Sequence, residues 1–147
     1  MSTRRLDFAI ALLALIGLAV ASYLTYVHYA GIKPLCLASG GCEQVQSSRY
    51  AKVGGVPVAV LGLVGYAGIL ASLWIRGELG RAMTACLALV GFGFSAYLTY
   101  REVFTIKAIC QWCVGSAVVM TALAVLAVAR LLLAGPTQGA PASGMAD

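Results

Sequence analysis

Charge is scarce in this 147-residue chain, because Asp, Glu, Lys and Arg make up only 10% of it and none of them falls within four long stretches. These stretches comprise residues 8–32, 53–75, 82–100 and 108–129. The mean hydropathy is +0.93 and 61% of the residues are hydrophobic, which excludes a soluble domain of this length. Ion-coupled transport is poorly supported as well, since it generally relies on a charged side chain within the membrane.

Each charge-free stretch is long enough to cross a bilayer, whose hydrocarbon core requires about 20 apolar residues per helix. The sequence therefore predicts an all-α membrane protein with a bundle of four transmembrane helices, in one domain over residues 1–134. The first stretch exceeds the roughly 7–15 apolar residues of a signal-peptide core, so we interpret it as an uncleaved helix. Residues 135–147 are rich in small residues and proline, and we expect a disordered tail there.

The predicted topology places both termini on one side of the membrane and the segments 33–55 and 101–108 on the other. Each side of the membrane carries five lysines and arginines, so the total count does not decide the orientation. Arg4 and Arg5 precede the first helix and Lys33 alone follows it, which favours a cytoplasmic N-terminus. The net charge of +5 is spread over both sides and forms no basic patch of the kind that nucleic acid requires. Attraction to anionic lipid headgroups is the plainer interpretation.

Cysteine is the reactive side chain that the sequence does provide. One pair, Cys36 and Cys42, follows the first stretch, and a second pair, Cys110 and Cys113, opens the fourth. Residues 12–36 align without a gap to residues 86–110, with 11 of 25 positions identical, and this internal repeat carries Cys36 and Cys110 to equivalent places. Two dithiols brought together at a membrane are typical of an electron relay between thiols and a lipid-borne acceptor.

The spacing of the cysteines indicates different roles for the two pairs. In Cys-x-x-Cys one thiol can attack and the other can resolve the mixed disulfide. A helix beginning near Lys107 would place Cys110 in its first turn, where the helix terminus and the ammonium group favour a thiolate. Cys113 would lie one turn deeper, facing an oxidant dissolved in the membrane. We expect Cys36 and Cys42 to lie on a supple loop that exchanges electrons with a soluble partner.

Other interpretations of these thiols remain open at this point. The four cysteines could form inert disulfides in a small non-redox membrane protein, such as a transporter or a structural tetraspan. A four-thiolate zinc site would need a tight knuckle from each pair, which Cys-x5-Cys supplies poorly, so we expect no metal. The fifth thiol, Cys86, has no partner in the sequence pattern and is interpreted as a small apolar residue.

Further motifs accompany the cysteines in a fixed order. They are Ser47-Ser48-Arg49-Tyr50 after Cys42, Gly55-Val56-Pro57 followed by Gly62 and Tyr66, and Cys110-Gln111-Trp112-Cys113. In this order the motifs resemble those of bacterial homologues of vitamin K epoxide reductase, and the resemblance covers roughly residues 8–130.

The resemblance implies a role for each cysteine. Cys113 faces a quinone, Cys110 forms an exchangeable disulfide with Cys42, and Cys36 resolves that disulfide and reacts with a thioredoxin-like protein. The candidate quinone-binding residues are Ser48, Val58, Tyr66 and Ala117.

The function implied is that of a membrane thiol:quinone oxidoreductase. It would oxidise a thioredoxin-like or DsbA-like protein in trans and reduce ubiquinone or menaquinone. Its place would be a bacterial inner membrane, with the cysteines on the periplasmic side and both termini in the cytoplasm. The chain contains no asparagine, and Ala117 occupies the position of a tyrosine in animal members that reduce vitamin K. Epoxide reduction is therefore not carried over.

Overall fold

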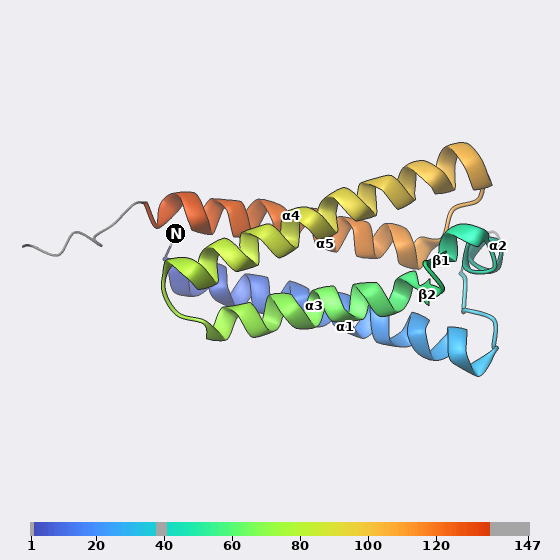
Figure 1. The fold of residues 1–147 in the computed structure, drawn as a ribbon, viewed down its shortest axis with the longest axis horizontal. Helices are drawn as coiled ribbons and strands as arrows, with labels where there is room; N and C mark the ends of the chain where they lie inside the picture. Colours follow the sequence, from blue (N-terminus) through green and yellow to red (C-terminus); the bar gives the residue numbers. More distant parts are fainter. Residues whose placement is uncertain (1, 38–40, 136–147) are drawn as a thin grey trace, which may run out of the picture.

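Long helices make up most of the described chain, which comprises residues 2–37 and 41–135 of a computed structural model. The helices run alternately in opposite directions, so that the start of α1 and the end of α5 lie at the same end of the bundle (Figure 1). This arrangement confirms the predicted all-α, multi-pass membrane protein. The long helices are α1 (Thr3–Ala30), α3 (Val58–Trp74), α4 (Glu78–Arg101) and α5 (Gln111–Leu133).

Length differs among these helices. By length and composition, α1, α5 and the unit formed by α4 and η2 (Glu102–Ile106) are able to cross a membrane. The α3 helix is apolar and shorter, with 17 residues. It begins at Val58, five residues after the start of the charge-free stretch 53–75, because residues 52–57 form a hairpin. The antiparallel strands are β1 (Lys52–Val53) and β2 (Val56–Pro57), and positive φ values at Gly54 and Gly55 make the tight turn between them.

The helices close into a four-sided bundle, in which α1 and α4 each pack against both α3 and α5. Its core includes Ile10, Ile69 and Leu123, all fully shielded from the surface. Gly17 permits a close approach between α1 and α3, since a Cβ atom at this position would overlap the ring of Tyr66. Tyr66 is thereby held in the middle of the bundle with 1% of its surface exposed.

A polar network joins the helices at the end where the termini lie. The hydroxyls of Ser72 on α3 and Thr84 on α4 are 2.7 Å apart, and both side chains are buried. The guanidinium of Arg130 on α5 donates to the Thr84 hydroxyl and forms an ion pair with Asp7 on α1. Because each polar group has a partner from a neighbouring helix, the network links the helices without leaving the Arg130 charge unpaired.

The connections at the opposite end contain short elements, which include α2 (Gly41–Gln46) and η1 (Arg49–Ala51). The α4 helix continues directly into η2, a π-helical turn, and Lys107 then ends it in the left-handed conformation with φ 54°. The α5 helix begins at Gln111, so the prediction that it begins near Lys107 was wrong. The left-handed residue redirects the chain after η2, and an extended segment leads to Cys110.

The predicted disordered tail over residues 135–147 lies outside the described residues, apart from Gly135. The domain boundary at residue 134 therefore stays a prediction.

Candidate active site

The first cysteine pair forms a disulfide between the segment after α1 and the short helix α2. Cys36 and Cys42 are bonded, with 6.3 Å between their Cα atoms. Cys42 was expected on a supple loop, but it lies in α2 and its side chain is fully buried. The residues from 38 to 40, between the two cysteines, lie outside the described part of the chain.

The second pair lies at the start of α5 as two free thiols. Cys110 is the residue that precedes the first turn, and Cys113 lies within that turn. Cys110 is fully buried, and its backbone N–H donates to the Glu102 carboxylate at 3.5 Å. Cys113 is half-buried, and the side-chain amide of Gln46 donates to its sulfur at 3.8 Å.

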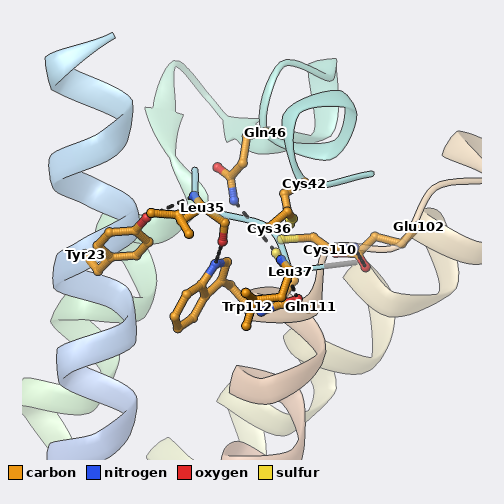
Figure 2. Close-up of a disulfide and its surroundings, with 11 residues drawn as sticks. Tyr23, Leu35, Cys36, Leu37, Cys42, Gln46, Glu102, Cys110, Gln111 and Trp112 are labelled. Carbon is orange, nitrogen blue, oxygen red and sulfur yellow. Dashed lines mark hydrogen bonds between the residues drawn. A yellow bond between two sulfur atoms is a disulfide. The ribbon is translucent and has the colours of Figure 1, made fainter. Parts of the chain in front are cut away.

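The two pairs meet in one apolar cluster at the end of the bundle opposite the termini. Cys42, Val45 and Cys110 form its buried centre, and Cys36 and Cys113 pack against it. Figure 2 shows the disulfide beside Cys110, with α2 folded over the beginning of α5. Cysteines from distant parts of the sequence therefore lie in one cluster.

Aromatic and amide side chains fasten the segment carrying Cys36 to α5. Trp112 donates from its indole N–H to the Leu35 carbonyl at 2.8 Å, and the Leu35 N–H donates to the Tyr23 hydroxyl at 3.0 Å. The rings of Tyr23 and Trp112 lie 5.1 Å apart (Figure 2). Gln111 accepts a further hydrogen bond from the Leu37 N–H. Cys36 therefore lies between two anchored residues, which limits its distance from the second pair.

Gly41 allows α2 to lie directly against the segment that precedes Cys110. A Cβ atom on Gly41 would come within 2.5 Å of the Ile109 carbonyl oxygen. We expect Gly41→Ala to lower the free energy of unfolding by about 1–3 kcal/mol, the usual cost of overpacking, and to slow thiol exchange between the two pairs. Thermal unfolding in detergent and the rate of that exchange measure the two effects.

Gly65→Ala is the matched control, because a Cβ atom there meets nothing within 4 Å and the residue lies inside α3. We expect it to be neutral or stabilising by about 0.5–1 kcal/mol. Equal stability and equal exchange rates in the two variants would contradict the tight docking of α2.

The two free thiols differ in charge. A hydrogen bond from the Cys113 thiol lowers the pKa of Cys110 from 9.0 to about 7, against the opposing effect of burial. The thiol of Cys113, rather than Lys107, is the main cause of this shift. Near neutral pH, a substantial share of Cys110 is therefore the thiolate in the reduced pair, and thiolates are the species that exchange with disulfides.

A cavity of about 130 Å³ lies between the helices beside Cys113. All four long helices, α2, η1 and η2 contribute to its wall, which is mainly apolar. The sulfur of Cys113 forms part of the wall, so a molecule in the cavity would contact the second cysteine pair. The polar groups around it include those of Gln46, Ser48, Tyr66 and Ser116, and the hydroxyls of Tyr66 and Ser116 are 2.8 Å apart.

Comparison with known protein families gives a match over residues 8–128 to the model of the vitamin K epoxide reductase family. The chain belongs to the vitamin K epoxide reductase family. Members are quinone-dependent thiol oxidoreductases, so this chain is an enzyme of that class. Membership decides against the alternative of a non-redox transporter or tetraspan, and the resemblance in the sequence is confirmed at the level of the family.

The residues that the family resemblance indicated for quinone binding divide into two groups. Ser48, Val58 and Tyr66 line the cavity beside Cys113. Ala117 lies instead in a separate groove between α4 and α5, which it shares with Phe92 and Val118. A residue on that groove does not contribute to the cavity wall, so we do not assign quinone binding to Ala117.

Gln46 and Glu102 were not recognised in the sequence, although both contact the second cysteine pair. Gln46 follows Cys42 by four residues, which is one helical turn, and that spacing was the available signal. Glu102 was placed outside the membrane stretch that ended at residue 100. In the structure the helical path continues through η2, and the Glu102 side chain lies inside the bundle.

Proposed function

We propose that this member of the vitamin K epoxide reductase family oxidises the dithiol of a thioredoxin-fold, DsbA-like protein and reduces ubiquinone or menaquinone. The loop pair, Cys36 and Cys42, exchanges with the partner. The second pair, Cys110 and Cys113, delivers the electrons to the quinone. The family assignment supplies the reaction class, and the arrangement of the four sulfur atoms supports this order of electron transfer.

One observation carries the proposal, namely that an oxidised loop pair touches a reduced pair on a cavity wall. Cys36 and Cys42 are joined as a disulfide, whereas Cys110 and Cys113 are free thiols. This combination corresponds to the stage after electrons have left the loop pair and before they reach the quinone. Cys113 borders the cavity and Cys110 lies towards Cys42. The two thiols of the second pair are therefore placed to react with different partners, one with the quinone and one with the first pair.

Electrons pass from the partner to the second cysteine pair in two thiol–disulfide exchanges. A partner thiolate attacks the Cys36–Cys42 disulfide, and the partner's second thiol completes its own disulfide, which leaves Cys36 and Cys42 as thiols. Cys42 then attacks Cys110 in an oxidised Cys110–Cys113 pair and releases Cys113. Cys36 next attacks Cys42, which restores the loop disulfide and leaves both thiols of the second pair reduced. Two electrons and two protons then pass to the quinone.

The direction of this transfer is favourable when the quinone has a higher reduction potential than the partner. A strongly oxidising thioredoxin-fold protein has a potential near about −120 mV, and about 30 mV corresponds to roughly 1.4 kcal/mol for two electrons. A quinone above that potential therefore draws electrons through the thiols. The buried position of Cys110 and Cys42 keeps the intermediate disulfide away from other thiols.

The cavity has the size of a single ring, which is the reactive part of a quinone. An engineered apolar cavity of about 150 Å³ binds benzene, and the cavity beside Cys113 has about 130 Å³. Ser48, Tyr66 and Ser116 place hydroxyl groups on its wall, where they can hydrogen-bond to quinone carbonyls. We assign the quinone ring to this cavity.

The proposed location is a bacterial inner membrane, with the cysteine end of the bundle in the periplasm and both termini in the cytoplasm. An oxidising compartment is the one in which disulfides persist and in which thioredoxin-fold oxidants act. Arg4 and Arg5 in the first turn of α1 support the same orientation, because the cytoplasmic ends of membrane helices carry an excess of cations.

Trapping the partner tests this function. Host membranes are quenched with acid, free thiols are blocked with an alkylating reagent, and proteins joined to the chain by a disulfide are identified by mass spectrometry. We expect a thioredoxin-fold protein linked through Cys36. Cys36→Ser should remove the adduct, and Cys86→Ser should retain it, since Cys86 lies outside the cysteine cluster. A partner of another fold, or an adduct that persists in Cys36→Ser, would refute the proposed electron donor.

A further inference from the structure

A buried carboxyl group lies beside the second cysteine pair. Glu102 has 4% of its surface exposed, at the point where α4 passes into the π-helical turn η2. Ionisable side chains inside a membrane bundle are costly to bury, and those that persist there commonly serve proton or ion transfer. Glu102 has no part in the thiol exchanges described above, so its burial calls for another explanation.

The local backbone determines where this carboxyl group points. The neighbouring Arg101 is directed outward, with its guanidinium group against the rings of Tyr50 and Tyr97. Glu102 lies one residue further along the helix and is turned into the bundle. Among residues 2–37 and 41–135, no lysine or arginine nitrogen lies within ion-pair distance of its carboxylate. An ion pair therefore does not account for the position of Glu102.

The carboxyl group contacts the second cysteine pair and lines the cavity. One oxygen accepts the Cys110 N–H at 3.5 Å, and the carboxyl group also interacts with the Cys113 thiol. Glu102 and Cys113 both line the cavity of about 130 Å³, and Figure 2 shows Glu102 directed toward Cys110. A group in this place can receive a proton from sulfur and deliver it to a molecule in the cavity.

We propose that Glu102 transfers a proton from the Cys113 thiol to a carbonyl oxygen of the bound quinone. This inference rests on the proposed reduction of a quinone in that cavity. The Glu102 carboxylate takes the proton as the Cys113 sulfur adds to the quinone ring, and it then protonates the oxygen on which charge develops. The Cys110 thiolate attacks the Cys113 sulfur, so that the S–S bond forms and the bond from sulfur to the ring breaks. The released anion takes its second proton from water, and two electrons have passed to the hydroquinone.

Glu102→Gln separates proton transfer from packing. Glutamine has nearly the same size and its carbonyl oxygen can still accept the Cys110 N–H, but the amide cannot carry the proton. General acid–base catalysis typically contributes about 10²–10⁴-fold, so we expect the rate of quinone reduction by the reduced second pair to fall by about that factor. Rapid mixing of the reduced, purified protein with a short-chain quinone measures this step by the absorbance of the quinone.

The exchange of the Cys36–Cys42 disulfide with a small dithiol is measured in parallel, and we expect it to be unchanged in Glu102→Gln. Glu43→Gln is the matched control for quinone reduction, because Glu43 lies at the same end of the bundle in an exposed ion pair with Lys33. In Glu102→Ala, added formate should restore part of the lost rate, because a small carboxylic acid can occupy the vacated space and carry the proton.

The possible outcomes distinguish a failure of the role of Glu102 from a failure of the proposed function. Unchanged quinone reduction in Glu102→Gln, with an active parent protein, would overturn the role of Glu102 and leave the proposed function intact. Equal losses in both half-reactions, or a Glu102→Ala variant that formate does not rescue, would also overturn it, because they indicate a structural role. A parent protein that exchanges disulfides but does not reduce the quinone would refute the proposed function itself.

Discussion

Quinone reduction should fall by on the order of 10³-fold or more in Cys113→Ala, because this change removes the sulfur that we propose to contact the quinone. Cys113 is the member of the second pair on the cavity wall, and Cys110 lies behind it toward Cys42. Without Cys113, a thiol at position 110 has no partner with which to form a disulfide as the quinone takes up electrons. Turnover is measured in lipid vesicles that contain the quinone and a reduced dithiol donor.

The bundle of Cys113→Ala should remain folded, since the change removes one half-buried sulfur atom from a cavity wall. We expect a loss of about 1 kcal/mol or less in the free energy of unfolding, as for removal of one small buried group. Cys86→Ala, which alters an exposed thiol on α4, is the matched control and should retain full turnover. Normal turnover in Cys113→Ala would refute the relay, whereas loss of folded protein would be visible in thermal unfolding.

Cys36→Ser should stop oxidation of the partner and should allow a disulfide between Cys42 and Cys110 to accumulate. The serine removes the thiol that restores the loop disulfide, so Cys42 stays free to attack an oxidised second pair. Cys42 and Cys110 are both fully buried in the same cluster, and the tight approach of Gly41 to Ile109 brings their segments together. A disulfide between them requires Cα atoms about 4.4–6.8 Å apart.

The experiment oxidises the Cys36→Ser protein with quinone, blocks the remaining thiols with an alkylating reagent and maps disulfide-linked peptides by mass spectrometry. We expect the peptide that links Cys42 to Cys110, with Cys113 alkylated. The double variant Cys36→Ser/Cys110→Ser should lack that peptide and serves as the control. Recovery of the Cys110–Cys113 pair alone, with Cys42 always alkylated, would contradict exchange between the two pairs.

Much of the fold could be predicted because its main driving force is local. The absence of charge over residues 8–32 and 108–129 requires those segments to lie in lipid, and the resulting helices α1 and α5 match them closely. Helix ends were less predictable. A hydrophobic stretch shows where a helix can cross the membrane, but it does not show that Gly54 and Gly55 turn a hairpin before α3 begins.

The candidate site could be predicted only in part, for a related reason. Reactive groups are visible in a sequence, so the four cysteines were found, and the even number of predicted spans placed both pairs on one side of the membrane. Which residues lie next to the cysteines depends on the rotational phase of each helix and on irregularities in its backbone. The π-helical turn at Glu102 brings its carboxyl group inward, and the phase of α5 directs Ala117 to a different groove from Cys113.

The sequence by itself determined that this protein is a helical membrane protein with two cysteine pairs at one end, because hydrophobicity and residue order are properties of the chain alone. Only the tertiary structure decided which sulfur borders the cavity, that α2 lies against the segment before Cys110, and that Glu102 lies beside the thiols. The docking of α2 arises from a contact between residues far apart in the sequence, Gly41 with Ile109, whereas the other two features depend on helix phase and on the π-helical turn at Glu102, and the hydrophobic pattern fixes none of these.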